Sequence, residues 1–161
     1  MPQHPGPFTR KPPRPVQALL FGMVAVGGLD ILDAIVFFGF RDVPPIRIFQ
    51  SIASGLLGAS AYSGGLSTAI LGGVLHFFIA FCIVAVYYVA SRKLPGLAHH
   101  PLRYGPLYGL VVYGIMTMIV VPLSAASTGA PDLAVIINGV CIHMVGVGLP
   151  SALCAWRVPP A

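Results

Sequence analysis

Charged residues are scarce in this chain. Only 8% of its 161 residues are Asp, Glu, Lys or Arg, and just 4 of these are acidic. A water-soluble domain carries about 25% charged residues. Hydrophobic residues instead make up 57%, and the mean hydropathy is +0.88. The composition therefore excludes an ordinary soluble domain and predicts an integral membrane protein.

Motifs of soluble enzymes are also missing from the sequence. We find no nucleophile elbow, phosphate-binding loop, zinc-protease helix or paired acidic motif, so we expect a protein that is not an enzyme. The three cysteines, Cys82, Cys141 and Cys154, all lie in apolar runs, which argues against a disulfide framework. The basic residues flank the apolar runs, as in membrane topology signals, and do not form a nucleic-acid-binding patch.

Four apolar runs are long enough to cross a bilayer, which takes ~20 residues per helix. We place these spans at about 16–40, 66–91, 105–124 and 133–156, in a single transmembrane domain covering residues 16–157. Residues 1–15 are basic and rich in proline, and we expect them to form a disordered tail. The first run is too long for the apolar part of a secretory signal peptide. Asp132, just before the fourth span, is predicted to cap that helix.

A shorter apolar stretch, about 46–62, separates the first two spans. Its polar residues, among them Gln50, Ser51 and Ser54, recur with the spacing of one helical face. A short helix could lie at the membrane interface and cover the mouth of the bundle. Alternatively it could re-enter the membrane, so that these three residues line an entry path. The predicted fold is an all-α bundle of four transmembrane helices with this extra short helix.

The distribution of basic residues predicts the orientation of the chain. With four spans and both termini in the cytoplasm, only Arg41 and Arg47 lie outside. A fifth span would move the loop between Arg92 and Arg103 to the outside, against the positive-inside rule. The cytoplasmic side then carries Arg10, Lys11, Arg14, Arg92, Lys93, Arg103 and Arg157.

Three ionisable residues interrupt the apolar runs: Asp30, His76 and His143. In this topology each lies roughly ten residues from the outer end of its span. At ~1.5 Å rise per residue the depth is ~15 Å, near the middle of the bilayer. A charge there costs roughly 2.5–3.5 kcal/mol on insertion scales, so an ionisable residue at this depth indicates a functional site by default.

Small residues share the helical faces of these three side chains, which is typical of helix contacts in membranes. We therefore expect Asp30, His76 and His143 to point into the bundle, together with Tyr113 from the third span. Asp33 lies on the face of Asp30 but nearer the outside, and would extend a path outward.

Two functions compete for this cluster. The leading expectation is a small non-enzymatic membrane protein, an accessory or self-associating subunit, in which the cluster locks the helices together. Asp30 would then accept a hydrogen bond from a His or Tyr side chain. The alternative is a small transporter or proton-conducting protein in which Asp and His titrate along a path. The expected partners are the lipid bilayer and other membrane subunits or a second copy, and not nucleic acid.

Two cofactors are further alternatives, although none is expected. His76 and His143 stand on parallel, diagonal spans of an up-down bundle, as the axial ligands of haem b require, so a haem b-binding redox membrane subunit is a further alternative function. Copper could instead be held by soft ligands, drawn from Cys141, His143, Met144 and either Met116 or Met118.

Several segments along the chain form a recognisable combination: QSIASGLLG, LGGVLHFFIA, YYVASR, YGPLYGLVVYG, VVPLS and VGLP. Together they resemble segments of small uncharacterised bacterial inner-membrane proteins. The resemblance covers about residues 20–155 and implies a location in the bacterial inner (cytoplasmic) membrane, with no activity attached.

Overall fold

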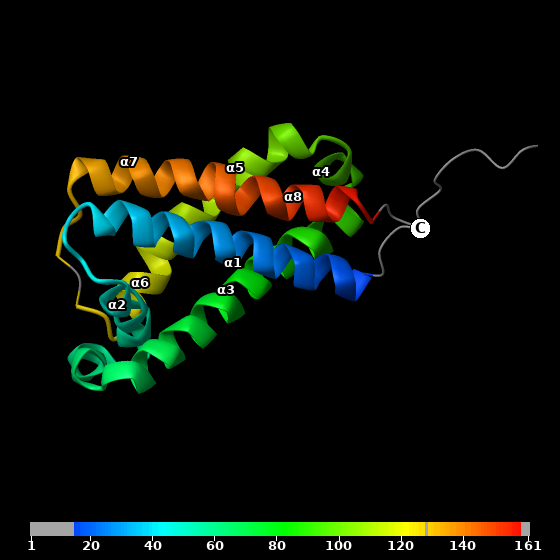
Figure 1. Cartoon of the computed structure of the whole chain (residues 1–161). Helices are drawn as coiled ribbons and strands as arrows, with labels where there is room; N and C mark the ends of the chain where they lie inside the picture. The colour runs from blue at the N-terminus through cyan, green and yellow to red at the C-terminus, as the bar shows by residue number, and fades with distance from the viewer. Residues whose placement is uncertain (1–14, 128, 159–161) are drawn as a thin grey trace, which may run out of the picture.

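A computed structural model describes residues 15–127 and 129–158, and every element in this part of the chain is helical (Figure 1). The predicted tail, 1–15, lies almost entirely outside the described residues. The elements are α1 (Pro15–Gly39), α2 (Pro45–Leu57), the 3-10 helix η1 (Gly58–Ser63), α3 (Gly65–Lys93), α4 (Pro95–His99), α5 (Pro101–Ile115), the π-helix η2 (Met116–Val120), α6 (Val121–Leu123), α7 (Leu133–Ile142), the π-helix η3 (His143–Gly148) and α8 (Leu149–Trp156).

Four helices are long and apolar enough to cross a membrane. They are α1, α3, the continuous helix Pro101–Leu123, and the continuous helix Leu133–Trp156. The predictions of an all-α chain and of four candidate membrane helices are therefore confirmed. The third helix begins at Pro101, four residues before the expected start, because proline is favoured in the first turn of a helix.

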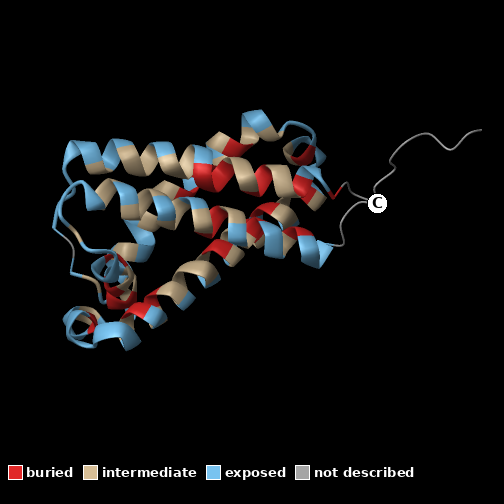
Figure 2. Ribbon diagram, in the orientation of Figure 1, coloured by how far each residue is buried: buried red, intermediate tan, exposed pale blue. Residues whose placement is uncertain are grey.

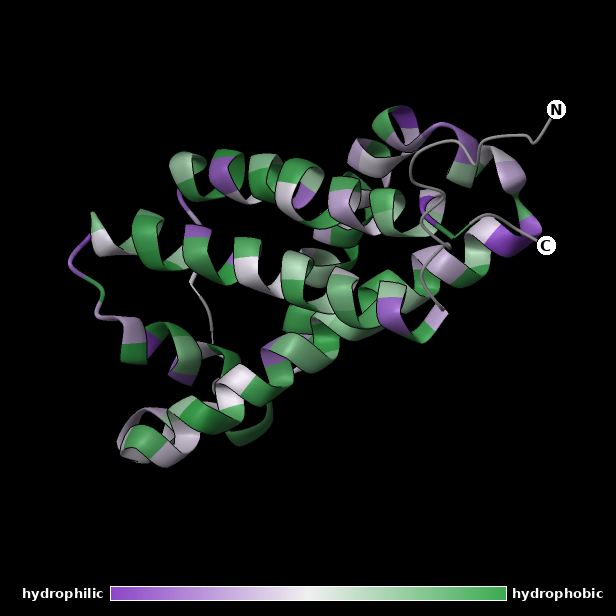
Figure 3. Ribbon diagram, turned by 45° about the vertical axis from the view of Figure 1, so that its right-hand side comes forward, coloured by the Kyte–Doolittle hydropathy of each residue, from purple (hydrophilic) through white to green (hydrophobic). Residues whose placement is uncertain are grey.

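Hydrophobic residues predominate along these helices (Figure 3). Phe21, Leu102 and Met118, for example, are more than 70% exposed in the isolated molecule. Exposed apolar surface on this scale is unfavourable in water but is the surface that lipid chains contact. The four helices thus have the surface of a membrane protein.

The helices pack most tightly in the half of the molecule that contains α4, which we call the α4 end (Figure 2). A core cluster of Val26, Ala80, Val84, Val112 and Val147 joins α1, α3, α5 and η3, and each of these residues is at most 5% exposed. Nearby, α5 crosses the fourth span so closely that Gly109 lies against the backbone of His143. Glycine is required there because a Cβ atom would collide with that backbone.

At the opposite end, which we call the α2 end, α3 diverges from α1 and α2 fills the space between them (Figures 1 and 3). Gly72 of α3 lies against the Phe49 carbonyl of α2. The Gln50 amide of α2 is buried and donates to the Gly65 carbonyl at 3.0 Å. With 13 residues, α2 is too short to cross a bilayer.

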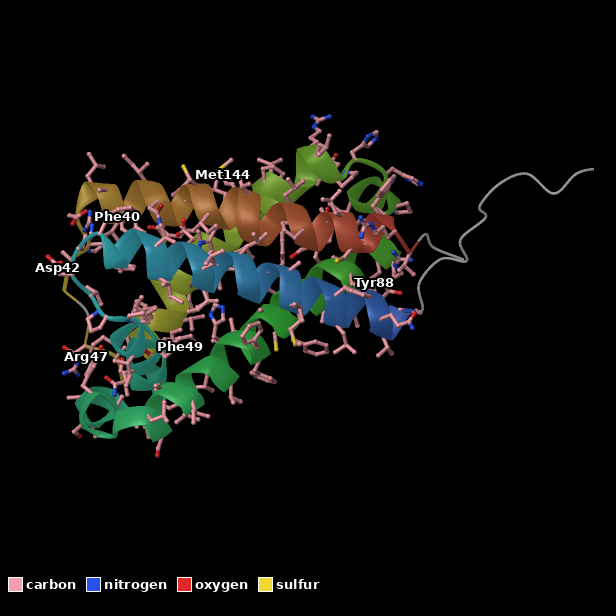
Figure 4. All side chains as sticks on the ribbon, in the orientation of Figure 1. Phe40, Asp42, Arg47, Phe49, Tyr88 and Met144 are labelled. Carbon is pink, nitrogen blue, oxygen red and sulfur yellow. The ribbon has the colours of Figure 1, made fainter. Side chains whose placement is uncertain are left out.

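An ion pair ties two helices together at the α2 end. The Arg41 guanidinium, which follows α1, donates to the Asp132 carboxylate at 2.6 Å. Asp132 also accepts from the backbone N–H of Val135 at 2.9 Å, so the predicted helix cap is confirmed. The guanidinium and this backbone bond lower the pKa of Asp132 to about 2. In Figure 4, Asp42 and Arg47 mark this end and Tyr88 lies toward the other.

Candidate functional site

The four spans and α2 surround a partly open cavity of about 290 Å³. Asp30, His76, Tyr113 and His143 all line it, each from a different span. The structure therefore brings together the side chains whose depth and helical faces suggested a common site. Much of the remaining wall is apolar: Val26, Ile31, Ala34, Phe38, Ile48, Ile52, Ile79, Ala80, Ile83, Met116 and Val147.

Asp30 is the only acidic residue among the described lining residues, and none of them is Lys or Arg. Its carboxylate has no hydrogen-bond partner within the described chain. His76 and His143 nevertheless lie close enough to interact with it electrostatically. Asp30 is thus held at the cavity without the direct bond from His or Tyr that a purely structural network would contain.

Both histidines are bonded to backbone carbonyls instead. The Nε2 atom of His76 lies 2.8 Å from the Gly27 oxygen of α1, and the Nδ1 atom of His143 lies 2.9 Å from the Gly139 oxygen of its own helix. A carbonyl oxygen can only accept, so each ring donates from the bonded nitrogen. When the ring is neutral, its other nitrogen, Nδ1 of His76 or Nε2 of His143, is an acceptor.

Tyr113 packs against the second histidine. The two ring centroids are 5.3 Å apart in an edge-to-face arrangement, at an interplanar angle of 71°. Gly139 lies against the Tyr113 ring, where a larger residue would displace it. The glycine one turn before His143 therefore makes room for the tyrosine, as expected for small residues at a helix contact.

Two π-helical segments lie at this level, and both precede a proline. η2 ends at Val120 before Pro122, and η3 ends at Gly148 before Pro150. Proline lacks an N–H and its ring crowds the carbonyl four residues earlier, so the helix widens upstream of it. Widened turns of this kind are frequent at functional sites. Here they carry cavity-lining residues: Met116, Thr117, His143 and Val147.

The cavity extends toward the α2 end and is closed toward the α4 end. Ala34 and Phe38 continue the Asp30 face of α1 toward α2, where Ile48, Ser51 and Ile52 also line the cavity. In the other direction the valine-rich core cluster fills the space between the helices.

The other residues of the predicted site have different positions. Of the predicted entry residues, only Ser51 lines the cavity. Gln50 and Ser54 are buried against neighbouring backbone, where Ser54 donates to the Ser51 carbonyl at 2.6 Å. Asp33 does not line the cavity, because its carboxylate accepts from the Asn138 amide at 2.7 Å.

The residues of the two cofactor alternatives are placed differently from one another. For haem b, His76 and His143 both line the cavity, with Nε2 of His76 bonded to the Gly27 carbonyl and Nδ1 of His143 bonded to the Gly139 carbonyl. For copper, Cys141 is exposed and Met118 is 79% exposed, whereas His143 and Met116 face the cavity. Figure 4 labels Met144 on the side of the fourth span away from α3. Across residues 15–127 and 129–158, no three His, Cys, Asp or Glu side chains are placed to hold a metal.

Some cavity residues carried no signal in the sequence. Phe38, Ile48 and Ile52 are ordinary apolar residues of α1 and α2, and only the packing of α2 beside α1 and α3 makes them part of the wall. Thr117 was visible as the residue one turn after Tyr113, and its hydroxyl donates to the Tyr113 carbonyl at 2.8 Å.

No family model, curated protein or solved structure matches this chain.

Proposed function

We propose that this protein is a small membrane carrier or conductor that takes a proton or small solute into the Asp30 cavity. The observation that carries the proposal is the position of the Asp30 carboxylate, which lines the cavity without a hydrogen-bond partner among the described residues. A carboxylate at membrane depth is costly to keep. If its role were only to fix the helices, we would expect it to be satisfied by a neighbouring donor.

The shape of the cavity supports entry from the α2 end. The wall runs from Asp30 past Ala34 and Phe38 to α2. On the other side, Val26, Val84 and Val147 are each at most 2% exposed and separate Asp30 from the α4 end. Transfer across the membrane then requires these valines to move apart, and the widened η2 and η3 turns beside them are the natural places for that movement.

The orientation is part of the proposal. The α4 end carries Arg92, Lys93, Arg103 and Arg157, whereas the α2 end carries Arg41 and Arg47. By the positive-inside rule the α4 end faces the cytoplasm and the cavity opens outward. In this arrangement the chain is a four-helix bundle of the bacterial inner membrane, with α2 at the outer interface. Its partner is the lipid bilayer.

Flux measurements on the purified protein in liposomes test the proposal. With a pH or solute gradient imposed, we expect wild-type flux that Asp30→Asn reduces by at least about tenfold, because a neutral amide cannot exchange the proton. Asp33→Asn is the matched control on the same helix, since Asp33 is bonded to Asn138 and lies outside the cavity wall. Flux that persists unchanged in Asp30→Asn would rule the proposal out.

An accessory or self-associating subunit is the second candidate, and a separate observation favours it. No atom of a neighbouring residue lies within 4 Å of where a Cβ atom would be at Gly28 of α1 or Gly114 of α5. Each glycine therefore leaves open space beside its helix. Small residues on lipid-facing surfaces allow another helix to approach closely. Gly28→Leu and Gly114→Leu should then reduce cross-linking between copies or co-purification of a partner subunit. Unchanged association in both variants would argue against this candidate.

A further inference from the structure

Most hydrogen-bond donors around the cavity are already bonded to backbone carbonyls, whereas several acceptors have no donor. The ring N–H groups of His76 and His143 are taken by backbone carbonyls. The hydroxyl of Thr117 donates to the Tyr113 carbonyl at 2.8 Å, and that of Ser51 donates to the Ile48 carbonyl at 2.7 Å. Of the groups that line the described cavity, only the Tyr113 hydroxyl remains as an unused donor.

The acceptors that remain come from three different helices. They are the Asp30 carboxylate and, when the rings are neutral, Nδ1 of His76 and Nε2 of His143, because the backbone bond of each ring places the proton on its other nitrogen. A ligand that satisfies such a set must itself bring N–H or O–H donors. Asp30 is the only acidic side chain among the described lining residues, and no Lys or Arg lines the cavity, so a ligand with a positive charge would complement its carboxylate.

From this arrangement we propose that the cavity binds a small organic cation, a protonated amine with an apolar body. The inference rests on the proposed function in that it names the solute of the same site. The ammonium group would be held by Asp30 and the two histidine acceptors. The apolar body would lie against the aliphatic wall and the rings of Tyr113 and Phe38, where its apolar surface is removed from water.

The size and lining of the cavity favour an amine over other cations. A volume of about 290 Å³ is at the lower limit of ligand pockets, which suits a molecule of a single ring or a short chain. A hard metal cation needs several oxygen ligands. Here Asp30 supplies the single carboxylate of the described wall, beside the neutral hydroxyl oxygens of Ser51, Tyr113 and Thr117, and most of the remaining wall is aliphatic.

A series of probes that differ only in charge tests this inference. The full-length protein in detergent micelles is titrated at pH 7 with 4-fluorobenzylammonium, 4-fluorobenzyl alcohol and 4-fluorobenzoate, and binding is followed by 19F NMR. We expect saturable binding of the ammonium probe alone, above the linear partition of all three into the micelle.

Three variants assign the binding to the cavity. Asp30→Asn should bind the ammonium probe at least about tenfold more weakly, because one charge-assisted hydrogen bond is lost. Asp33→Asn should bind as the wild type does. Ala34→Phe places a larger side chain in the cavity without removing any acceptor, so it should also abolish binding. This variant still tests the inference if Asp30→Asn fails to fold.

Other outcomes would overturn the inference. Saturable binding of the alcohol or the benzoate as tight as that of the ammonium probe would show that charge is not what the cavity recognises. Ammonium binding that survives both Asp30→Asn and Ala34→Phe would place it elsewhere. If no ammonium probe binds but proton flux depends on Asp30, this inference fails and the proposed function stands. Ammonium binding with no flux of any kind would retain the amine site and refute the carrier.

Discussion

Single glycines decide how closely the third and fourth spans approach each other. A methyl group at Gly109 would meet the backbone of His143 and Met144, whereas one at Gly114, five residues later in the same helix, would meet nothing within 4 Å. The position of His143 in the cavity thus depends on the absence of a side chain on a neighbouring helix. This dependence links a residue without functional groups to the candidate site.

Gly109→Ala is therefore expected to destabilise the protein. Forcing a methyl group into a packed contact costs about 1–3 kcal/mol, which should appear as a lower unfolding temperature in detergent. Gly114→Ala is the matched control and should be neutral or slightly stabilising, because alanine is the better helix former by about 1 kcal/mol. Equal unfolding temperatures for the two variants would contradict the close contact.

The Arg41–Asp132 ion pair makes a second prediction at the scale of residues. The hydrogen bond from Arg41 is the main reason why the pKa of Asp132 falls from 3.8 to about 2, with the Val135 bond adding to it. Because the pKa is lower in the folded state, the pair contributes stability above pH 3.8. That contribution is lost as the pH falls through about 2.

Thermal unfolding of the wild type and Arg41→Gln at a series of pH values measures this contribution. Both groups are exposed, so we expect only a small difference in unfolding temperature near neutral pH. The difference should shrink between pH 4 and pH 2, as Asp132 takes up its proton. A difference that stays constant down to pH 2 would show that Arg41 acts through some other contact.

At the scale of elements, the two π-helical segments are the features that shape the cavity. Each follows a stretch of regular helix and ends two residues before a proline. A regular α-helix through His143 would rotate that ring relative to Tyr113, because one residue is 100° of helical turn. The prolines thus set the direction of side chains that lie well away from them.

Pro150→Ala tests this relation. Alanine restores an N–H that can donate to the Gly146 carbonyl, four residues earlier, so we expect η3 to tighten toward an α-helix and His143 to move. The side-chain 15N NMR signals of His143 should shift and flux should fall, while the unfolding temperature holds or rises. Pro106→Ala, near the start of the third span, is the control. Unchanged His143 signals in Pro150→Ala would show that Pro150 is not the cause of the π-helical turn.

At the scale of the whole molecule, charge is distributed unevenly between the two ends. The α2 end carries the Arg41–Asp132 pair, Asp42 and Arg47, whereas the α4 end carries Arg92, Lys93, Arg103 and Arg157 without any acidic residue. Asp30 and Asp33 complete the acidic residues of the chain. This asymmetry is what sets the expected orientation in the membrane.

The orientation is tested with single cysteines in a background where Cys82, Cys141 and Cys154 are replaced by alanine. In intact cells, a membrane-impermeant maleimide should label Asp42→Cys, at the α2 end, and leave His99→Cys, in α4, unlabelled until the membrane is opened. Labelling of His99→Cys from the outside would reverse the topology, and with it the side from which the cavity opens.

Local sequence properties were sufficient for the general architecture. Hydropathy and length are read residue by residue, so the four long apolar helices, the cap at Asp132 and the presence of a short helix near 46–62 could all be predicted. Small residues beside Asp30, His76, Tyr113 and His143 also indicated the inward faces of the helices. The structure places these four side chains around one cavity.

What the sequence determined by itself is thus the all-helical class and the four candidate membrane helices, because each follows from composition and period along the chain. Only the tertiary structure decided that the Asp33 carboxylate accepts from Asn138, 105 positions away, and that the Asp30 carboxylate has no hydrogen-bond partner among residues 15–127 and 129–158. It also decided which donors are consumed by backbone carbonyls. These outcomes depend on the rotation and spacing of helices that are distant in sequence, and those are set by glycine contacts and proline-widened turns.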